Sequence, residues 1–261
     1  MKTRKSEIVV LFIIVFLAGI LYLSGMPFCL LNITVQNKDI PLENAFYIVN
    51  TFFLSIAVIA IVKITMKDWV FGLTSKQLIK SLIDNGKIFF LGIFVTLLLS
   101  IYIYKPLDRL PLAGEIILWG FLFNFSVAII EEILLRALLL KTFERIFVNN
   151  TILAVIVASA IFGIAHIPGM IKENIYVIII RVIGTTAVGI SLSLIYIKTK
   201  NLWTVIVLHF LLNCSVIIYY FSNSNNVYEI AKIWPIPMII VCIINLKTIK
   251  IMENKNRANG I

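Results

Sequence analysis

Uninterrupted apolar runs recur along the whole chain, and they constrain its fold more than any other feature of the sequence. Each run is roughly 17 to 25 residues long, which is enough for a helix to cross a hydrocarbon core of about 30 Å. The composition agrees, since 61% of the 261 residues are hydrophobic and 14% are charged, whereas soluble domains hold about 45–50% apolar residues. The sequence therefore predicts an all-α, polytopic membrane helix bundle of about eight transmembrane helices.

No segment of domain length lies between these runs, so we expect residues 1–261 to form a single membrane domain. The first run follows a basic start, as in a signal peptide, but it is long for one and no clear A-x-A cleavage site follows. We therefore interpret it as an uncleaved first span. The predicted spans lie near Ile8–Leu23, Ala45–Ile64, Ile88–Tyr104, Ala113–Leu140, Thr151–Ile167, Ile175–Ile197, Leu202–Phe221 and Pro235–Leu246.

The distribution of basic residues predicts the orientation of the bundle. Short cytoplasmic loops carry an excess of Lys and Arg, and 17 of the 23 basic residues fall on the side of the two termini, so both termini are predicted to be cytoplasmic. The net charge of +10 is spread over loops that flank the membrane, where anionic headgroups attract it. We therefore expect the lipid bilayer, and no nucleic acid, as a partner. Residues 68–87 are predicted to form an interfacial amphipathic helix.

Polar residues within the spans locate a candidate site. Ionisable side chains in a membrane are costly and usually face the interior of a helix bundle or a water-filled cavity. Both histidines of the chain belong to this set, whereas the three cysteines are scattered and define neither a disulfide framework nor a metal site. The polar residues of the spans are Glu131, Glu132, Arg136, His166, Arg181, His209 and Asn213.

Helical spacing separates the two adjacent carboxylates. Glu132 and Arg136 are four residues apart, so they share a face and are predicted to form an ion pair. Glu131 is turned by about 100° from Glu132 and has no obvious partner on its own helix. A rise of about 1.5 Å per residue puts Glu131 and His209 at similar depths, roughly 14 to 15 Å from the nearest inner-side lysines. His166 lies deeper, roughly 24 Å from the start of its span, so that span must tilt if the side chains are to meet.

Arg181, in the sixth predicted span, permits two interpretations. A buried salt bridge is the expected one, because an intramembrane charge is normally paired. The other is that Arg181 neutralises a carboxylate or the terminus of a substrate.

Together these groups suit the hydrolysis of a peptide bond. A carboxylate and an imidazole around one water form a general-base pair, and an imidazole with a carboxamide can donate hydrogen bonds to the developing charge on a carbonyl oxygen. The alternative is structural, since Glu–Arg pairs and single His or Asn residues also join helices in bundle cores. A proton-coupled transporter is a further alternative, but the chain lacks the internal repeat and paired broken spans of a midplane carrier.

The motifs in these spans resemble those of the CPBP family of intramembrane proteases, also called the Abi or CAAX-protease-like family. The family pattern is E-E-x-x-x-R, then F-x-x-x-H, then H-x-x-x-N or a near variant. The resemblance covers residues 113–220, which would form a CPBP-like catalytic core. The motifs of this chain are Glu131-Glu132-Ile-Leu-Leu-Arg136, Phe162-Gly-Ile-Ala-His166 and His209-Phe-Leu-Leu-Asn213.

The resemblance implies an intramembrane endopeptidase that cleaves a membrane-associated peptide or protein. We predict no cofactor, and the alternative is a Zn²⁺ ion held by two histidines and a glutamate. The implied roles are a water-activating pair of Glu131 and His166, an oxyanion hole of His209 and Asn213, and supporting residues Glu132 and Arg136.

Bacterial relatives are associated with peptide maturation and bacteriocin self-immunity. The bias of the chain towards Ile, Lys and Asn is typical of a low-GC bacterium, so we expect a multi-pass protein of a bacterial cell membrane. The competing hypothesis is a non-catalytic immunity or scaffold protein with the same fold. The sequence does not predict the oligomeric state.

Overall fold

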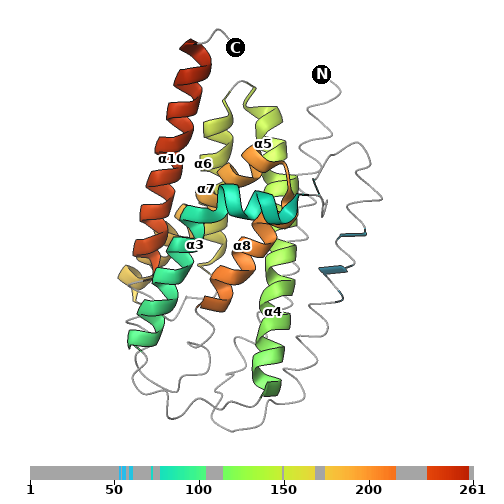
Figure 1. The fold of residues 1–261 in the computed structure, drawn as a ribbon, viewed down its shortest axis with the longest axis vertical. Helices are drawn as coiled ribbons and strands as arrows, with labels where there is room; N and C mark the ends of the chain where they lie inside the picture. The colour runs from blue at the N-terminus through green and yellow to red at the C-terminus, as the bar shows by residue number, and fades with distance from the viewer. Residues whose placement is uncertain are drawn as a thin grey trace.

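The computed structural model describes residues 53, 55–56, 59–60, 72, 77–103, 114–148, 150–167, 174–215 and 234–258, and every regular element among them is helical. Figure 1 shows these helices gathered in one bundle. The first predicted span and nearly all of the second lie outside the described residues. The helices are α3 (Leu78–Ile103), α4 (Gly114–Glu132), η2 (Ile133–Leu140), α5 (Lys141–Ile146), α6 (Thr151–Ala165), α7 (Ile175–Thr199), α8 (Leu202–Ser215) and α10 (Pro235–Ala258).

Two of these helices, α3 and α7, are long and apolar enough to cross a membrane, as judged by length and composition. They overlap the third and sixth predicted spans. Helices α6 and α8 and the first half of α10 are also apolar but shorter. The all-helical fold class is thus confirmed for the described residues, and the number of spans stays a prediction.

Helix α3 begins at Leu78, earlier than the predicted span that starts at Ile88. Residues 78–87 therefore belong to the same helix as that span and do not form a separate interfacial helix. Figure 1 shows that the first turns of α3 run across the bundle before the helix bends and continues along it. The rest of the predicted amphipathic segment lies outside the described residues, apart from Gly72 and Gln77.

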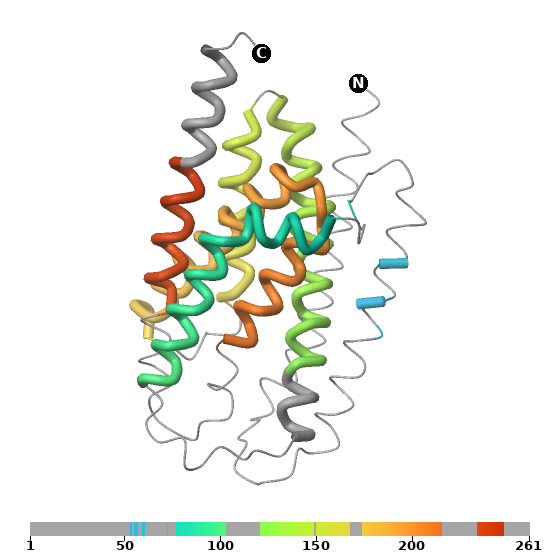
Figure 2. Tube along the Cα trace, in the orientation of Figure 1, coloured from blue at the N-terminus to red at the C-terminus, as the bar shows by residue number. Residues whose placement is uncertain are grey.

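The packing of the bundle centres on α7 and α8. Helix α7 packs against α6 and α10, and α8 packs against α4 and α3, as the tube in Figure 2 also shows. Buried apolar side chains from these helices and from η2 form one core, which includes Ile133, Leu192, Ile206 and Leu208. This core surrounds the candidate site residues of α4, η2 and α8.

Large apolar side chains also cover the outside of the described bundle. The buried set, by contrast, includes Glu132, Arg136 and His209. An apolar exterior around ionisable residues is the reverse of a soluble domain, and it fits a bundle whose solvent is lipid. The exposed apolar side chains include Leu91, Phe94 and Leu98 of α3, Ile175, Ile179 and Ile183 of α7, and Ile236, Ile240 and Ile243 of α10.

Two glycines bring α6 and α7 close together beside the candidate residues. A Cβ atom at Gly163 would lie 2.8 Å from the carbonyl oxygen of Val182, and one at Gly189 would lie 3.0 Å from the Cβ of Ser159. Small residues of this kind let membrane helices approach at backbone distance. The close contact therefore fixes the end of α6 that carries His166 against α7.

The fourth predicted span has an unexpected helical form. Helix α4 continues directly into η2 and α5, so one helical run extends from Gly114 to Ile146. Its middle part, η2, is π-helical, with hydrogen bonds from residue i to i+5 in place of i+4. Such turns are rare and frequent at functional sites. This one begins directly after Glu132 and includes Arg136, and it was not among the features predicted from the sequence.

Candidate active site

Glu132 is the centre of a buried polar network that joins α4, η2 and α8. Its Oε1 atom accepts a hydrogen bond from Nη1 of Arg136 at 2.8 Å and interacts with Nδ1 of His209 at 2.7 Å. The side chains of Arg136 and Glu132 are 1% and 0% exposed. The ion pair predicted from spacing is thus present, and it also includes a histidine from another helix.

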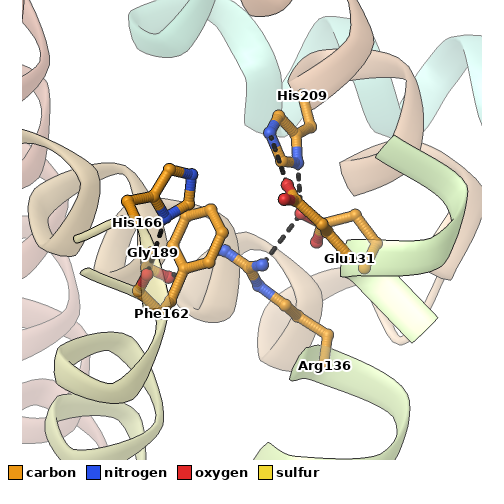
Figure 3. A network of polar contacts seen from close by, with 7 residues as sticks. Glu131, Arg136, Phe162, His166, Gly189 and His209 are labelled. Atoms are coloured by element: carbon orange, nitrogen blue, oxygen red, sulfur yellow. Dashed lines mark hydrogen bonds and ion pairs between the residues drawn. The ribbon is translucent and has the colours of Figure 1, made fainter. Parts of the chain in front are cut away.

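Glu131 faces the other nitrogen of the same imidazole. Its Oε2 atom lies 3.5 Å from Nε2 of His209, and its side chain is 17% exposed. His209 therefore contacts both of the adjacent carboxylates, and Figure 3 shows its ring next to Glu131. The prediction that Glu131 and His209 lie at the same depth is confirmed by this contact.

The hydrogen-bond partners of the two imidazoles determine which nitrogen carries a proton. An ionised carboxylate and a carbonyl oxygen can only accept hydrogen bonds. Nδ1 of His209 therefore donates to Glu132, and Nδ1 of His166 donates to the carbonyl oxygen of Phe162, 2.8 Å away. A neutral His166 then keeps an unprotonated Nε2, the form that accepts a proton. His209 can donate from Nε2 only as a doubly protonated imidazolium.

The ring of Phe162 lies among three charged or titratable side chains. Its centroid is 4.6 Å from the ring of His166 and 6.0 Å from that of His209. The guanidinium carbon of Arg136 lies 5.1 Å from the same centroid, within the range of a cation–π contact. Arg136 also donates from Nη2 to the carbonyl oxygen of Gly189 on α7 at 3.3 Å. This side chain therefore connects the network to both α6 and α7 (Figure 3).

His166 does not touch its predicted partner in the described part of the chain. No hydrogen bond or ion pair joins it to Glu131 there, although the two interact electrostatically at longer range, as do His166 and His209. The direct partner of Glu131 is His209 instead. The predicted pairing of Glu131 with His166 around one water thus stays a prediction.

Asn213 and Arg181 lie outside this network. Asn213 is half-buried on α8, one turn beyond His209, as its spacing predicts. Arg181 is half-buried on α7 and interacts with His166 at longer range. The salt bridge that we expected for Arg181 is not found among the described residues.

The arrangement does not fit the zinc alternative. A catalytic zinc ion takes three protein ligands and keeps one position open. Among the residues that the structure describes, no group of three or more His, Cys, Asp or Glu side chains could hold a metal ion. Glu131 and His209 are adjacent, but His166, the third ligand of the proposed set, makes no contact with either of them.

Residues 113–215 match a family model described as Type II CAAX prenyl endopeptidase Rce1-like. This segment is therefore similar to that protease family. The match confirms the resemblance to the CAAX-protease family, and the matched segment includes every candidate site residue. The Rce1-like family is a family of proteases, and its match, together with the two apolar helices of spanning length, supports a membrane protein. No curated protein and no solved structure matches the chain.

Sequence reasoning missed three features of the Rce1-like segment. These are the hydrogen bond between Glu132 and His209, the contact of Arg136 with the Gly189 carbonyl, and the π-helical form of η2. The first two join different helices, so spacing along one helix could not reveal them. The adjacent charges in an apolar helix were the available signal for the third, because π-helical turns concentrate at functional sites.

Proposed function

We propose that the chain is an intramembrane endopeptidase that hydrolyses a peptide bond in a membrane-associated peptide or protein. The observation that carries this proposal is the contact of His209 with both Glu131 and Glu132 inside an apolar bundle. A buried cluster of this kind is costly and seldom kept for packing alone. The cluster lies in the segment that matches a protease family, which favours peptide hydrolysis over other uses of the same groups.

Glu131 is the proposed general base. It is the more exposed of the two carboxylates, and among the described residues it forms no ion pair with a cation of its own helical run, so it can take a proton from water. The resulting hydroxide attacks the carbonyl carbon, and Glu131 then returns the proton to the leaving amine as the C–N bond breaks. His166 assists through Nε2, which its hydrogen bond to the Phe162 carbonyl leaves as the acceptor.

His209 and Asn213 are the proposed oxyanion hole. A protonated His209 can donate from Nε2 to the oxygen that gains charge, and the Asn213 carboxamide can donate from the next turn of α8. Glu132 acts through His209, because the 2.7 Å hydrogen bond to Nδ1 holds the imidazole in its orientation. Arg136 in turn pairs with Glu132 at 2.8 Å and so helps to hold that carboxylate in place.

The wider proposals concern topology and biological role. We propose eight spans, with both termini in the cytoplasm of a bacterial cell, because the basic residues concentrate on one side of the predicted spans. The proposed role is peptide maturation or bacteriocin self-immunity. In either role, the substrate would be a peptide that lies in or on the membrane.

The test compares the membrane peptides of cells that carry the native protein, Glu131→Ala or His166→Ala. Quantitative mass spectrometry should find at least one peptide that stays uncleaved only in the two variants, with its cleavage rate reduced by about 10²-fold or more. Glu144→Gln is the matched control. It also removes a carboxylate from the same helical run, but one that pairs with Lys141 on α5, away from the network.

The same cells separate the enzyme from a scaffold. If Glu131→Ala and His166→Ala keep full cellular function at native protein levels, with an unchanged set of membrane peptides, the protease proposal is wrong. The non-catalytic immunity or scaffold protein would then be the better account of the fold.

A further inference from the structure

Arg181 lies on the inward face of α7. A helix turns by about 100° per residue, and the exposed side chains at the start of α7 all fall on the face opposite Arg181. In the first part of the same helix, up to Thr185, the buried residues fall within about 60° of its direction. Arg181 therefore faces the bundle and not the lipid. The exposed residues are Ile175, Tyr176, Ile179 and Ile183, and the buried ones up to Thr185 are Val177, Gly184 and Thr185.

Arg181 also lies at the level of His166. Gly189 of α7 contacts the turn of α6 around Ser159, whereas Val182, seven residues earlier on α7, contacts Gly163, four residues later on α6. The two helices therefore run antiparallel. A Cβ atom at Gly163 would meet both Val182 and Thr186, so Gly163 faces α7 near Gly184. Three further residues along α6 lead to His166, and three residues back from Gly184 along α7 lead to Arg181.

No anionic side chain among the described residues pairs with Arg181. The guanidinium is half-buried on an inward face, and it interacts electrostatically with His166, a candidate catalytic residue. The carboxylates of the network are already engaged, since Glu132 binds Arg136 and His209, and Glu131 faces His209. A cation inside a membrane bundle is expensive unless an anion pairs with it, and the described residues supply none, so an anionic ligand would satisfy Arg181.

We propose that Arg181 is a specificity-determining residue whose guanidinium binds a carboxylate of the peptide substrate, next to the bond that is cleaved. The proposal rests on the proposed peptidase function and adds a substrate class, namely peptides with a carboxylate at a fixed distance from the scissile bond. Arg suits this role because its planar fork binds a carboxylate through two parallel hydrogen bonds. The inward direction of Arg181 favours a ligand inside the bundle over a lipid phosphate at its outer face.

Photo-crosslinking tests this proposal without requiring cleavage. The probes are N-palmitoylated octapeptides that carry a benzophenone group. They are made in pairs whose members differ in a single carboxylate. In one kind of pair Glu is replaced by Gln at one position, and in the other the C-terminal acid is replaced by an amide. They are offered to purified full-length protein in lipid nanodiscs. The proteins are the native chain, Arg181→Gln, Arg181→Lys and Lys198→Gln. The last is the matched control, because it removes an exposed cation from the opposite end of α7.

At one position of the probe, the carboxylate form should label the native protein at least about tenfold more strongly than the neutral form, as expected for one charge-assisted pair. Arg181→Gln should reduce this preference to within about twofold, and Arg181→Lys should keep part of it, because lysine keeps the charge and loses the fork. Lys198→Gln should keep the whole preference. Each preference is a ratio measured on one protein preparation, so a lower yield of a variant does not affect it.

Equal labelling by both forms at every position of the native protein would overturn the proposal. So would a preference that survives in Arg181→Gln. If labelling is equal and Arg181→Gln loses a tightly bound phospholipid that Lys198→Gln keeps, the guanidinium binds a lipid phosphate instead. Failure of the proposed peptidase function would give a different result from failure of the Arg181 proposal. The native protein would then cleave no peptide, but its labelling would still prefer the carboxylate form in a way that depends on Arg181.

Discussion

Replacing Arg136 with methionine should destabilise the protein by about 3–5 kcal/mol. The side chain is 1% exposed and donates to Glu132 at 2.8 Å and to the Gly189 carbonyl at 3.3 Å. Methionine fills most of the volume but leaves the fully buried Glu132 carboxylate with His209 alone. Removal of one partner of a buried ion pair is costly because the remaining charge is uncompensated.

The double variant Glu132→Leu/Arg136→Met should be less damaged than the single one. It removes both charges together, and replacement of a whole buried pair by apolar groups is often neutral. The remaining loss is that of the acceptor for Nδ1 of His209, which costs about 1–3 kcal/mol. We therefore expect the double variant to recover about 2 kcal/mol relative to Arg136→Met.

Unfolding in mixed micelles of increasing SDS fraction, followed by tryptophan fluorescence, measures these free energies. The matched control is Lys141→Met, which breaks the pair of Lys141 with Glu144 at 3.3 Å, whose side chains are 26% and 20% exposed. Loss of such a surface pair should cost about 1 kcal/mol or less. The reasoning is refuted if Arg136→Met is no less stable than Lys141→Met, or if the double variant is no more stable than Arg136→Met.

Two further substitutions test the α6–α7 contact and the oxyanion hole. Gly163→Ala should lower the unfolding free energy by about 1–3 kcal/mol, because its methyl group would clash with Thr186 Oγ1 and approach the Val182 carbonyl. The control Gly86→Ala, whose nearest neighbours are flexible side-chain ends, should cost less in the same SDS titration. Equal costs for the two variants would contradict this prediction. Asn213→Ala should slow hydrolysis by about 10²–10³-fold and change the unfolding free energy by about 0.5 kcal/mol or less. The rate is followed by mass spectrometry on the peptide found in the comparison of membrane peptides. An unchanged rate would exclude Asn213 from the oxyanion hole.

The sequence was informative about contacts within one helix. The pairing of Glu132 with Arg136 follows from their spacing, and it is present. The equal depth of Glu131 and His209 follows from the helical rise, and the two side chains meet. Both inferences need only the geometry of a regular helix and the membrane boundaries.

Contacts between helices could not be read in the same way. The tilt and rotation of neighbouring helices depend on how their side chains interlock, as at Gly163 and Gly189. For this reason spacing did not show that His209 pairs with Glu132, or that His166 makes no direct contact with Glu131. The continuation of α3 back to Leu78 was missed for a related reason, since an amphipathic pattern does not reveal whether one helix ends before the next begins.

The position of Arg136 on the same helix as Glu132 also bears on how the chain enters the membrane during synthesis. Because this pair lies within one helical run, it can form before any other helix is present, and these two side chains can then enter the membrane without net charge. Glu131 has no such local partner. Its contact, His209, is made 78 residues later, so the proposed base meets its imidazole only when α8 docks. We therefore expect the nascent protein to be inactive until this late step of assembly.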